Sequence, residues 1–359
     1  MSEAGGLDLS PYGPIRICSG KKTVARYLVA HHGFRQLHLR DEHGDASPGP
    51  ADTGRGTDGS ASGFPDALTV RSGAEPASFA TAEALLDYVT RRWQDRFVIT
   101  DLQSEAVVDV LARRPFFLLL SVEAPVLVRW RRLQERTNTD TDLQDFVTVD
   151  DADLYDAGKG QQPLISRATV RLLNTSKSLA QLHASLDKLD LSNPDRLRPS
   201  WDTYFMALAS LAAQRSNCMK RRVGCVIVGR EHGVISTGYN GTPRGLRNCA
   251  SGGCRRCNDG NGAGVALSTC LCIHAEENAL LEAGRERIRP GAVLYCDTCP
   301  CLTCSIKICQ VGIAEVVYAR DYSMDSATAA VFAQAGVSLR QFTPPHTGLV
   351  HLERMELYS

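Results

Sequence analysis

Three metal-binding side chains and one carboxylate stand at spacings that suit hydrolysis at a zinc ion. His274 and Glu276 are two residues apart, and Cys301 and Cys304 follow Pro300 in a CxxC pair. A zinc ion that catalyses hydrolysis needs three protein ligands and an open fourth position for water. One imidazole and two thiolates meet that need. Glu276 can face the water and move its protons without binding the metal.

The elements expected around these residues would bring them together. Cys301 and Cys304 lie three positions apart, so both point to one side of the first turn of a helix. Pro300 stands just ahead, where its missing amide hydrogen costs nothing, and the positive end of the helix favours thiolates. Residues 275–300 are long enough for the rest of a helix and one strand. The alternative, a structural zinc site beside an incidental glutamate, would normally close the fourth position.

Cysteine is concentrated in the same half of the chain. Of thirteen cysteines, only Cys18 precedes Cys218, and the last is Cys309. In a reducing compartment such a cluster indicates metal binding more than a disulfide framework. Three of the cysteines lie in or beside apolar runs and are better interpreted as small buried hydrophobic side chains, namely Cys225, Cys296 and Cys309.

Length and charge exclude several classes of protein. The 359 residues allow two ordinary domains. Forty basic and forty acidic side chains give zero net charge, which disfavours a nucleic-acid partner held by phosphate neutralisation. No apolar run reaches the roughly 18–20 residues that span a bilayer. The amino terminus lacks a secretory signal. We therefore expect a cytoplasmic protein without a membrane partner, which is compatible with a nuclear pool.

The amino-terminal half predicts a parallel-sheet α/β domain over residues 14–190. It follows a flexible terminus, residues 1–13, and contains a polar insertion at 41–63 that we expect to be disordered. Strands alternate with helices along it, which is typical of a parallel sheet. The segments expected are a strand, loop and helix within 14–40, a helix at 78–92, strands at 96–100 and 116–122, and a helix at 126–137.

Residues 19–23, SGKKT, resemble a phosphate-binding loop only in part. The full pattern needs a glycine at position 15 and a hydroxyl at position 22, where Ile15 and Lys22 stand. Residues 97–102 and 116–136 nevertheless resemble later strands and helices of small nucleotide and dephospho-coenzyme A kinases. We interpret this half as a degenerate P-loop kinase-like domain with a structural or regulatory role. The alternative is an active kinase in which Thr23 compensates through a shifted loop.

The carboxyl-terminal half predicts a second domain over residues 196–350. Its first two strands should form an antiparallel hairpin, so the sheet should be mixed within an α/β/α arrangement. The elements expected are a helix from Trp201, strands at 223–229 and 234–241, a helix at 272–284, a strand at 292–296, a helix at 301–312, a strand at 314–320 and a last strand near 337–342.

Residues 201–342 resemble the cytidine/deoxycytidylate deaminase superfamily, most closely its deoxycytidylate (dCMP) deaminases. The resemblance rests on VGCVIV, STGYNGTPRG with NC soon after, HAEENALL, PCLTC and QVGIAEVVY, in that order. The pattern H-x-E…P-C-x-x-C is the signature of zinc nucleobase deaminases. It implies hydrolysis of dCMP to dUMP and ammonia, with water attacking carbon 4 of the ring and Glu276 shuttling protons. This reaction supplies dUMP for thymidylate synthesis. Fungal members of the family carry a kinase-like extension ahead of the deaminase.

The resemblance also implies ligand sites. Asn240, with Gly241, maps onto a substrate-contacting position. The loop around it lies near the effector site, which implicates Gly238, Tyr239, Asn240 and Thr242. The substrate phosphate needs cationic partners, and the basic segment nearby offers Arg215, Lys220, Arg221 and Arg222. A solvated basic turn is the alternative interpretation of that segment.

A second, structural zinc is implied as well. Some family members, including a phage form, bind one through positions that here hold Cys218, Cys249 and Cys272. We expect Cys257 as the fourth ligand, with Cys254 or Cys270 as substitutes, because the CRRC pair is well spaced for chelation. The alternative is a set of reduced free thiols.

Similar dCMP deaminases are homo-oligomers, commonly hexamers, activated by dCTP and inhibited by dTTP, and we expect the same control here. Two other functions stay open. One is deamination of a different substrate, such as a nucleoside, a tRNA adenosine or a riboflavin precursor, although the neutral charge disfavours RNA. The other is a zinc-stabilised nucleotide sensor without turnover, which the intact His-Glu-Cys-Cys set disfavours.

Overall fold

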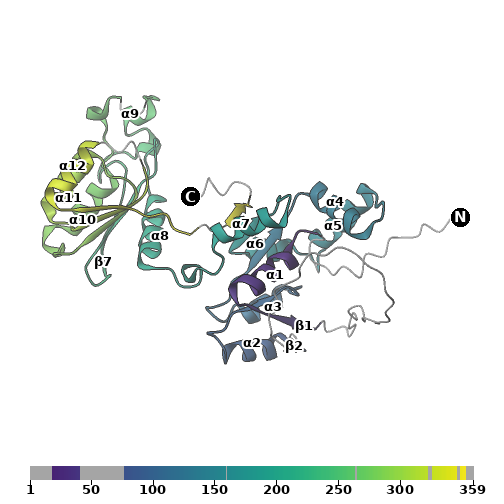
Figure 1. The fold of residues 1–359 in the computed structure, drawn as a ribbon. Helices are drawn as coiled ribbons and strands as arrows, with labels where there is room; N and C mark the ends of the chain where they lie inside the picture. Colours follow the sequence, from purple (N-terminus) through teal and green to yellow (C-terminus); the bar gives the residue numbers. More distant parts are fainter. Residues whose placement is uncertain are drawn as a thin grey trace, which may run out of the picture. The chain divides into compact units, whose positions relative to one another are not determined.

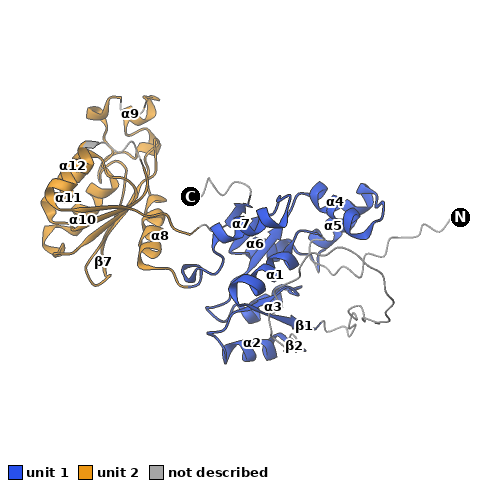
Figure 2. Cartoon of the chain, in the orientation of Figure 1, with its two compact units in different colours: residues 1–197, 346–359 blue, residues 198–345 orange. Residues whose placement is uncertain are grey.

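A computed structural model of the chain describes residues 18–40, 77–158, 160–262, 265–321, 326–345 and 348–352. The chain forms two compact units, residues 1–197 with 346–359, and residues 198–345 (Figure 2). The predicted terminus 1–13 and insertion 41–63 lie outside the described residues. We expected residues 346–350 in the second domain, but they belong to the first unit. The reason is that the strand formed by residues 348–351 pairs with residues 170–173.

The first unit contains parallel sheets, as predicted (Figure 1). Within the described residues one sheet has the order β2-β1-β3 and the other β11-β5-β4. The strands are β1 (Arg35–Leu39), β2 (Ala77–Phe79), β3 (Phe97–Ile99), β4 (Leu120–Glu123), β5 (Val170–Leu173) and β11 (Gly348–His351). The helices are α1 (Lys21–His32), α2 (Ala82–Thr90), α3 (Glu105–Leu111), α4 (Val126–Thr137), α5 (Leu143–Tyr155), α6 (Gln162–Arg167) and α7 (Leu179–Leu189).

Several elements differ from the prediction. The helix expected at 78–92 begins only at Ala82, because 77–79 pairs with β1 and the Thr81 side chain accepts a hydrogen bond from the Ala84 amide. The strand expected at 116–122 is formed only from Leu120. The helix expected at 126–137 matches α4 in full.

The second unit has one mixed five-stranded sheet in the order β10-β9-β8-β6-β7. Strand β6 (Gly224–Val228) runs antiparallel to β7 (Val234–Tyr239) and to β8 (Val293–Thr298), and the other pairs are parallel. The remaining strands are β9 (Glu315–Arg320) and β10 (Ser338–Gln341). The helices are α8 (Trp201–Ala213), α9 (Arg255–Asn258), α10 (Ala275–Ala283), α11 (Leu302–Val311) and α12 (Ser326–Ala335).

Helices cover both faces of this sheet (Figure 1). Because side chains alternate along a strand, Cys225 and Ile227 of β6 pack in the core that includes α10, α11 and α12. Val226 and Val228 pack on the opposite face against Phe205, Met206 and Ala209 of α8. The second unit is therefore an α/β/α layer structure.

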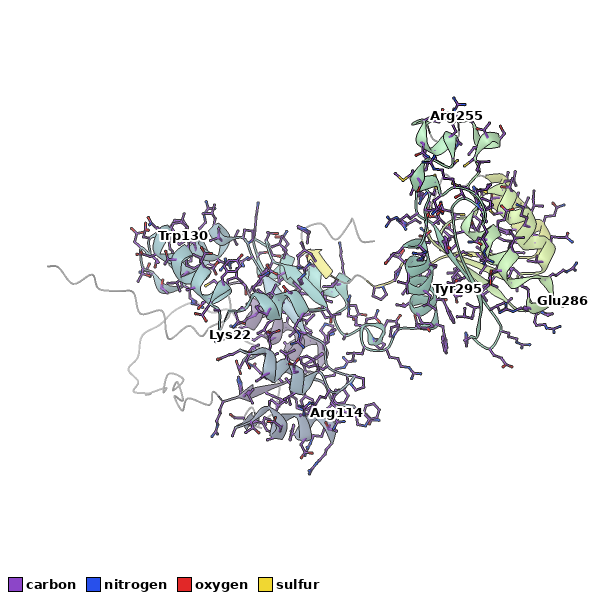
Figure 3. The ribbon with its side chains drawn as sticks, turned by 180° about the vertical axis from the view of Figure 1, so that it is seen from behind. Lys22, Arg114, Trp130, Arg255, Glu286 and Tyr295 are labelled. Atoms are coloured by element: carbon purple, nitrogen blue, oxygen red, sulfur yellow. The ribbon has the colours of Figure 1, made fainter. Side chains whose placement is uncertain are left out.

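A polar cluster connects three strands of this sheet to α8. Tyr295 of β8, labelled in Figure 3, donates its hydroxyl hydrogen to Asp202 of α8 at 2.8 Å. Arg340 of β10 binds Asp202 at 2.7 Å and Glu315 of β9 at 3.0 Å.

Among the described residues, no helix combines the length and the hydrophobicity that crossing a membrane requires.

Candidate active site

The predicted metal ligands lie at the amino-terminal ends of two neighbouring helices. His274 is the N-cap of α10, Cys301 is the N-cap of α11, and Cys304 lies in the first turn of α11. The Nδ1 atom of His274 is 3.3 Å from the Sγ atoms of both Cys301 and Cys304. These three atoms lie within 4.8 Å of one another. With metal–ligand bonds of about 2.0–2.3 Å, that spacing fits a single tetrahedral zinc ion.

The thiols of this group are not equivalent. Hydrogen bonds from Cys304, His274 and Thr303 lower the pKa of Cys301 to about 3, which favours its thiolate. The Thr303 hydroxyl lies 3.1 Å from the Cys301 Sγ. The contact with Cys301, together with burial, raises the pKa of Cys304. Since metals bind thiolates, the lowered pKa makes Cys301 the better prepared of the two thiols to bind a metal.

Glu276 is the second residue of α10 and is almost completely buried, with 4% of its surface exposed. Burial raises the pKa of its carboxyl group to about 7, and the neighbouring His274 opposes the shift. A carboxyl group with a pKa near neutrality can both accept and release a proton at physiological pH. This is the property that a proton shuttle requires.

One buried carboxylate of this region was missed by the sequence analysis. Asp297, near the end of β8, raises the pKa of Glu276 electrostatically. It accepts a hydrogen bond from Arg320 at 3.3 Å and one from the Thr298 hydroxyl at 3.1 Å. Burial raises its own pKa, and Arg221 and Arg320 oppose that shift. An acidic residue within the apolar strand AVLYCDT was the available signal.

Asn240 organises the basic segment with its own side chain. Its Oδ1 accepts hydrogen bonds from the Ser216 hydroxyl at 2.7 Å and the Val223 amide at 2.9 Å. Its Nδ2 donates to the Arg221 carbonyl at 2.8 Å. The side chain is buried, so most of its polar capacity is used in shaping residues 216–223. Of the basic side chains in that segment, Arg215, Lys220 and Arg222 are exposed and Arg221 is half-buried.

The residues expected to bind an effector fall in two environments. Gly238 is buried beneath α10, where an added Cβ would lie 2.1 Å from the Ala275 carbonyl oxygen. The structure thus gives Gly238 a packing role. Tyr239 accepts a hydrogen bond from Asn278 on its carbonyl. The Thr242 hydroxyl is buried without a hydrogen-bond partner among the described residues, and its amide donates to Asn217.

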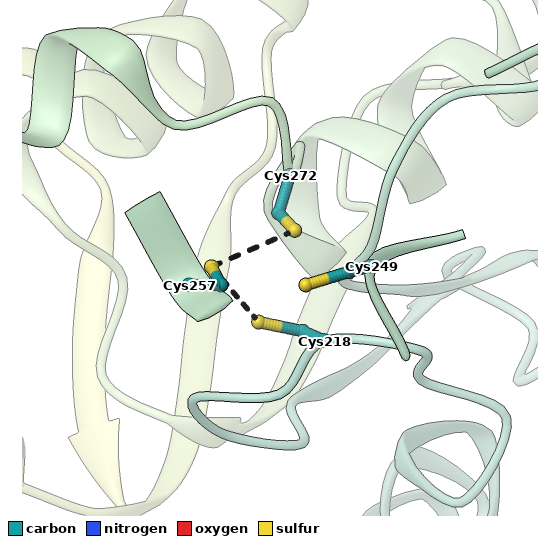
Figure 4. Close-up of side chains that lie close together, drawn as sticks. All are labelled: Cys218, Cys249, Cys257 and Cys272. Carbon is teal, nitrogen blue, oxygen red and sulfur yellow. Dashed lines mark hydrogen bonds between the residues drawn. The ribbon is translucent and has the colours of Figure 1, made fainter. Parts of the chain in front are cut away.

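The structure also gathers six further cysteines. The Sγ atoms of Cys218, Cys249, Cys257 and Cys272 all lie within 4.8 Å of one another (Figure 4). Cys254 and Cys270, which we expected only as substitutes, form a second such group with Cys257 and Cys272. No cysteine among the described residues is in a disulfide.

Comparisons with known proteins agree with this site. Residues 199–320 match the family model for the cytidine and deoxycytidylate deaminase zinc-binding region. The deoxycytidylate deaminase of Schizosaccharomyces pombe is 46% identical over 341 residues, which cover 94% of this chain and 98% of the relative. That of Saccharomyces cerevisiae is 47% identical over 272 residues, 73% of this chain and 86% of the relative. The human deoxycytidylate deaminase is 35% identical over 154 residues, 42% of this chain and 84% of the relative.

The fold of the second unit and its His-Cys-Cys group are those of a zinc-dependent deaminase. The two yeast relatives extend the similarity over most of the chain. The chain belongs to the deoxycytidylate deaminase family.

Proposed function

We propose that this protein hydrolyses dCMP to dUMP and ammonia, a reaction of hydrolases that act on cyclic amidine C–N bonds. The observation that carries the proposal is the His274, Cys301 and Cys304 group beside buried Glu276, in a chain that is 46% identical over nearly its whole length to a deoxycytidylate deaminase. The imidazole Nδ1 and the two thiolates would hold one zinc ion. When bound, the ion supplies Lewis-acid chemistry that makes water nucleophilic near neutral pH.

Glu276 would carry the protons of the reaction. Its carboxylate accepts a proton from the attacking water and delivers it to the ring nitrogen. It then transfers a second proton to the leaving amino group, which departs as ammonia. Burial raises the pKa of its carboxyl group to about 7, a value at which the group can both accept and release a proton. The water supplies the oxygen and both hydrogens, so substrate and water account for all atoms of dUMP and ammonia.

The phosphate of the nucleotide would be bound by the basic segment 215–222. Arg215 and Lys220 are exposed there, and Asn240 fixes the backbone of the segment at Arg221 and Val223. In this arrangement Asn240 and Gly241 would hold the substrate loop in place, Asn240 through its side-chain hydrogen bonds and Gly241 through its backbone bonds to Ile273. Tyr239 and Thr242 stay candidates for binding dCTP or dTTP, and the loop that carries them adjoins the catalytic helix. We propose a homo-oligomer, such as a hexamer, for this control.

The amino-terminal unit would be a degenerate P-loop kinase-like domain with a structural or regulatory role. Gly20 is the N-cap of α1 with a left-handed φ of 104°. The Nδ2 atom of Asn174 donates to the Ser19 carbonyl at 3.0 Å and lies 2.5 Å from the position of a Cβ on Gly20. Burial also lowers the pKa of Lys21 to about 8. The Asn174 side chain thus fills the space beside Gly20, which supports a structural role for this loop.

One assay separates the candidate substrates. Ammonia release should be measured from dCMP, CMP, deoxycytidine and cytidine under identical conditions. We expect dCMP to have the largest kcat/KM, because only it provides both the phosphate and the deoxyribose. A preference for an unphosphorylated nucleoside would reject the proposed substrate. Tight binding of dCMP without any ammonia release would favour the nucleotide sensor.

A further inference from the structure

Six cysteines outside the catalytic group, all in segments that precede α10, form one continuous cluster. Two four-membered groups lie within it, and both contain Cys257 and Cys272. We propose that this cluster holds a pair of zinc ions, with the Cys257 and Cys272 thiolates bridging the two. The first ion would be completed by Cys218 and Cys249, and the second by Cys254 and Cys270.

The distances between the sulfur atoms carry the proposal. A tetrahedral zinc with zinc–sulfur bonds of about 2.3 Å separates its sulfurs by about 3.8 Å. In the first group, the Sγ of Cys257 lies 3.9 Å from that of Cys218 and 4.0 Å from that of Cys272. In the second, the Sγ of Cys270 lies 3.8 Å from that of Cys257 and 3.9 Å from that of Cys254. Each group therefore has the size of a single zinc site.

The ligand count requires sharing. Zinc in structural sites takes four ligands, so one ion cannot use all six thiolates. Two separate four-cysteine sites would need more cysteines than the cluster has. Two tetrahedra that share the edge between Cys257 and Cys272 use all six. This arrangement also explains why the sequence offered more ligands than a single structural zinc needs.

The surroundings of the cluster suit a negative charge. Six thiolates and two zinc ions leave a net charge of about −2. The amides of Met219 and Leu271 donate to the Sγ atoms of Cys249 and Cys254, each at 3.4 Å. The buried Arg256 directs its Nη1 at the Cys270 sulfur at 3.8 Å. All three sulfurs are proposed terminal ligands, which retain more negative charge than bridging ones. A buried guanidinium needs such a partner.

The cluster joins the segments that shape the active site. Cys218 belongs to the basic segment 215–222, and Cys249 follows the loop that Asn240 begins. Cys272 stands two residues before His274. A metal pair here would fix the substrate loop to the beginning of the catalytic helix, while leaving the chemistry to the separate His-Cys-Cys site.

Metal analysis of the full-length protein tests the proposal. We expect about three zinc ions per chain, one catalytic and two in the cluster. The His274→Ala variant should keep about two, and its zinc X-ray absorption spectrum should show an all-sulfur shell with zinc–zinc scattering. About two zinc ions in the wild-type chain, or an all-sulfur shell without zinc–zinc scattering in the variant, would overturn the proposal. Visible absorption with stoichiometric iron would do the same and indicate an iron–sulfur cluster.

Single substitutions distinguish bridging from terminal cysteines. Cys257→Ser should remove about two zinc ions, whereas Cys270→Ser should remove about one, since four thiolates remain for the other ion. The control is Cys309→Ser, which lies outside both groups and should keep all three. Retention of all zinc by Cys270→Ser would show that Cys270 binds no metal and would overturn the paired site. These counts do not depend on activity, so they stand apart from the test of dCMP deamination.

Discussion

Gly241 and Ile273 exchange a pair of backbone hydrogen bonds, from the Gly241 amide to the Ile273 carbonyl at 3.2 Å and from the Ile273 amide to the Gly241 carbonyl at 3.0 Å. Gly241 follows Asn240 in the candidate substrate loop, and Ile273 directly precedes the candidate metal ligand His274. A shift of the loop would therefore displace the beginning of α10 as well. If an effector binds at the loop as proposed, this contact would connect it directly to the helix that carries Glu276.

Replacement of Glu276 by glutamine should abolish turnover while leaving the fold and the zinc content unchanged. The amide has the shape of the carboxyl group but cannot shuttle protons. General acid–base catalysis contributes roughly 10²–10⁴-fold, and Glu276 would move more than one proton. The measurement is kcat for dCMP together with the zinc content. Glu277→Gln is the matched control, because Glu277 is the next residue and binds Lys307 at 2.6 Å. Activity within a few-fold of wild type would reject the assigned role of Glu276.

Replacement of His274 or Cys301 by alanine should instead remove the catalytic metal. Each variant leaves only two of the three protein ligands, too few for a stable zinc site. We expect each purified variant to contain about one zinc ion fewer than the wild type. Metal analysis by mass spectrometry provides the count, with Cys309→Ser as the control. A variant that kept its full zinc content would show that the ligand set is wrong.

Neutralising the basic segment should weaken substrate binding more than it slows the chemistry. A charge-assisted hydrogen bond to the phosphate is worth about 1.5–3 kcal/mol, or roughly tenfold or more in KM. The variant replaces Arg215, Lys220, Arg221 and Arg222 by glutamine. Arg230→Gln, an exposed arginine in the β6–β7 turn, is the control. An unchanged KM for dCMP in the fourfold variant would remove this segment from the substrate site.

Gly238→Ala should destabilise the second unit. The added Cβ would meet backbone atoms of α10, 2.1 Å from the Ala275 carbonyl oxygen and 2.4 Å from the Ala279 nitrogen. Backbone atoms cannot rotate away as side chains do, so we expect a loss of about 1–3 kcal/mol in the free energy of unfolding. Gly233→Ala is a matched control, since nothing lies within 4 Å of its added Cβ. Equal denaturation midpoints for the two variants would contradict the close packing of α10 on β7.

Saturation with dCMP should be sigmoidal, and dCTP should make it hyperbolic while dTTP inhibits. An effector that favours one conformational state shifts the population towards that state. Cooperativity with one site per chain requires an oligomer, so sedimentation should give a mass well above 39.0 kDa. Hyperbolic kinetics that neither nucleotide changes, in a protein that sediments as a monomer, would contradict both expectations.

The proximity of His274, Cys301 and Cys304 could be predicted from the sequence because these residues stand at the beginnings of two helices. The CxxC spacing puts Cys301 and Cys304 together at the beginning of α11, and His274 stands at the beginning of α10. Asp297 and Arg320 could not be connected in this way. Their contact depends on the parallel register of β8 and β9, in which Thr298 is opposite Arg320.

Other features depended on packing that no spacing reveals. The role of Gly238 follows from how closely α10 approaches β7. The sequence identified the cysteines of the cluster, but whether Cys254 and Cys270 replace other ligands or add to them depends on how residues 249–272 fold back. Strand β11 was missed because its four residues pair with β5, far away in the sequence.

The pairing of β11 with β5 makes the second unit an insertion within the first. Val350 and Leu352 pack in the core formed with α1 and α7, and the Leu352 carbonyl accepts a hydrogen bond from Ser185. During synthesis the first unit therefore lacks one strand and part of its core until the whole deaminase unit has left the ribosome. The amino-terminal unit can therefore be completed only after the chain has been synthesised as far as β11. A chain shortened before β11 would expose an unpaired sheet edge.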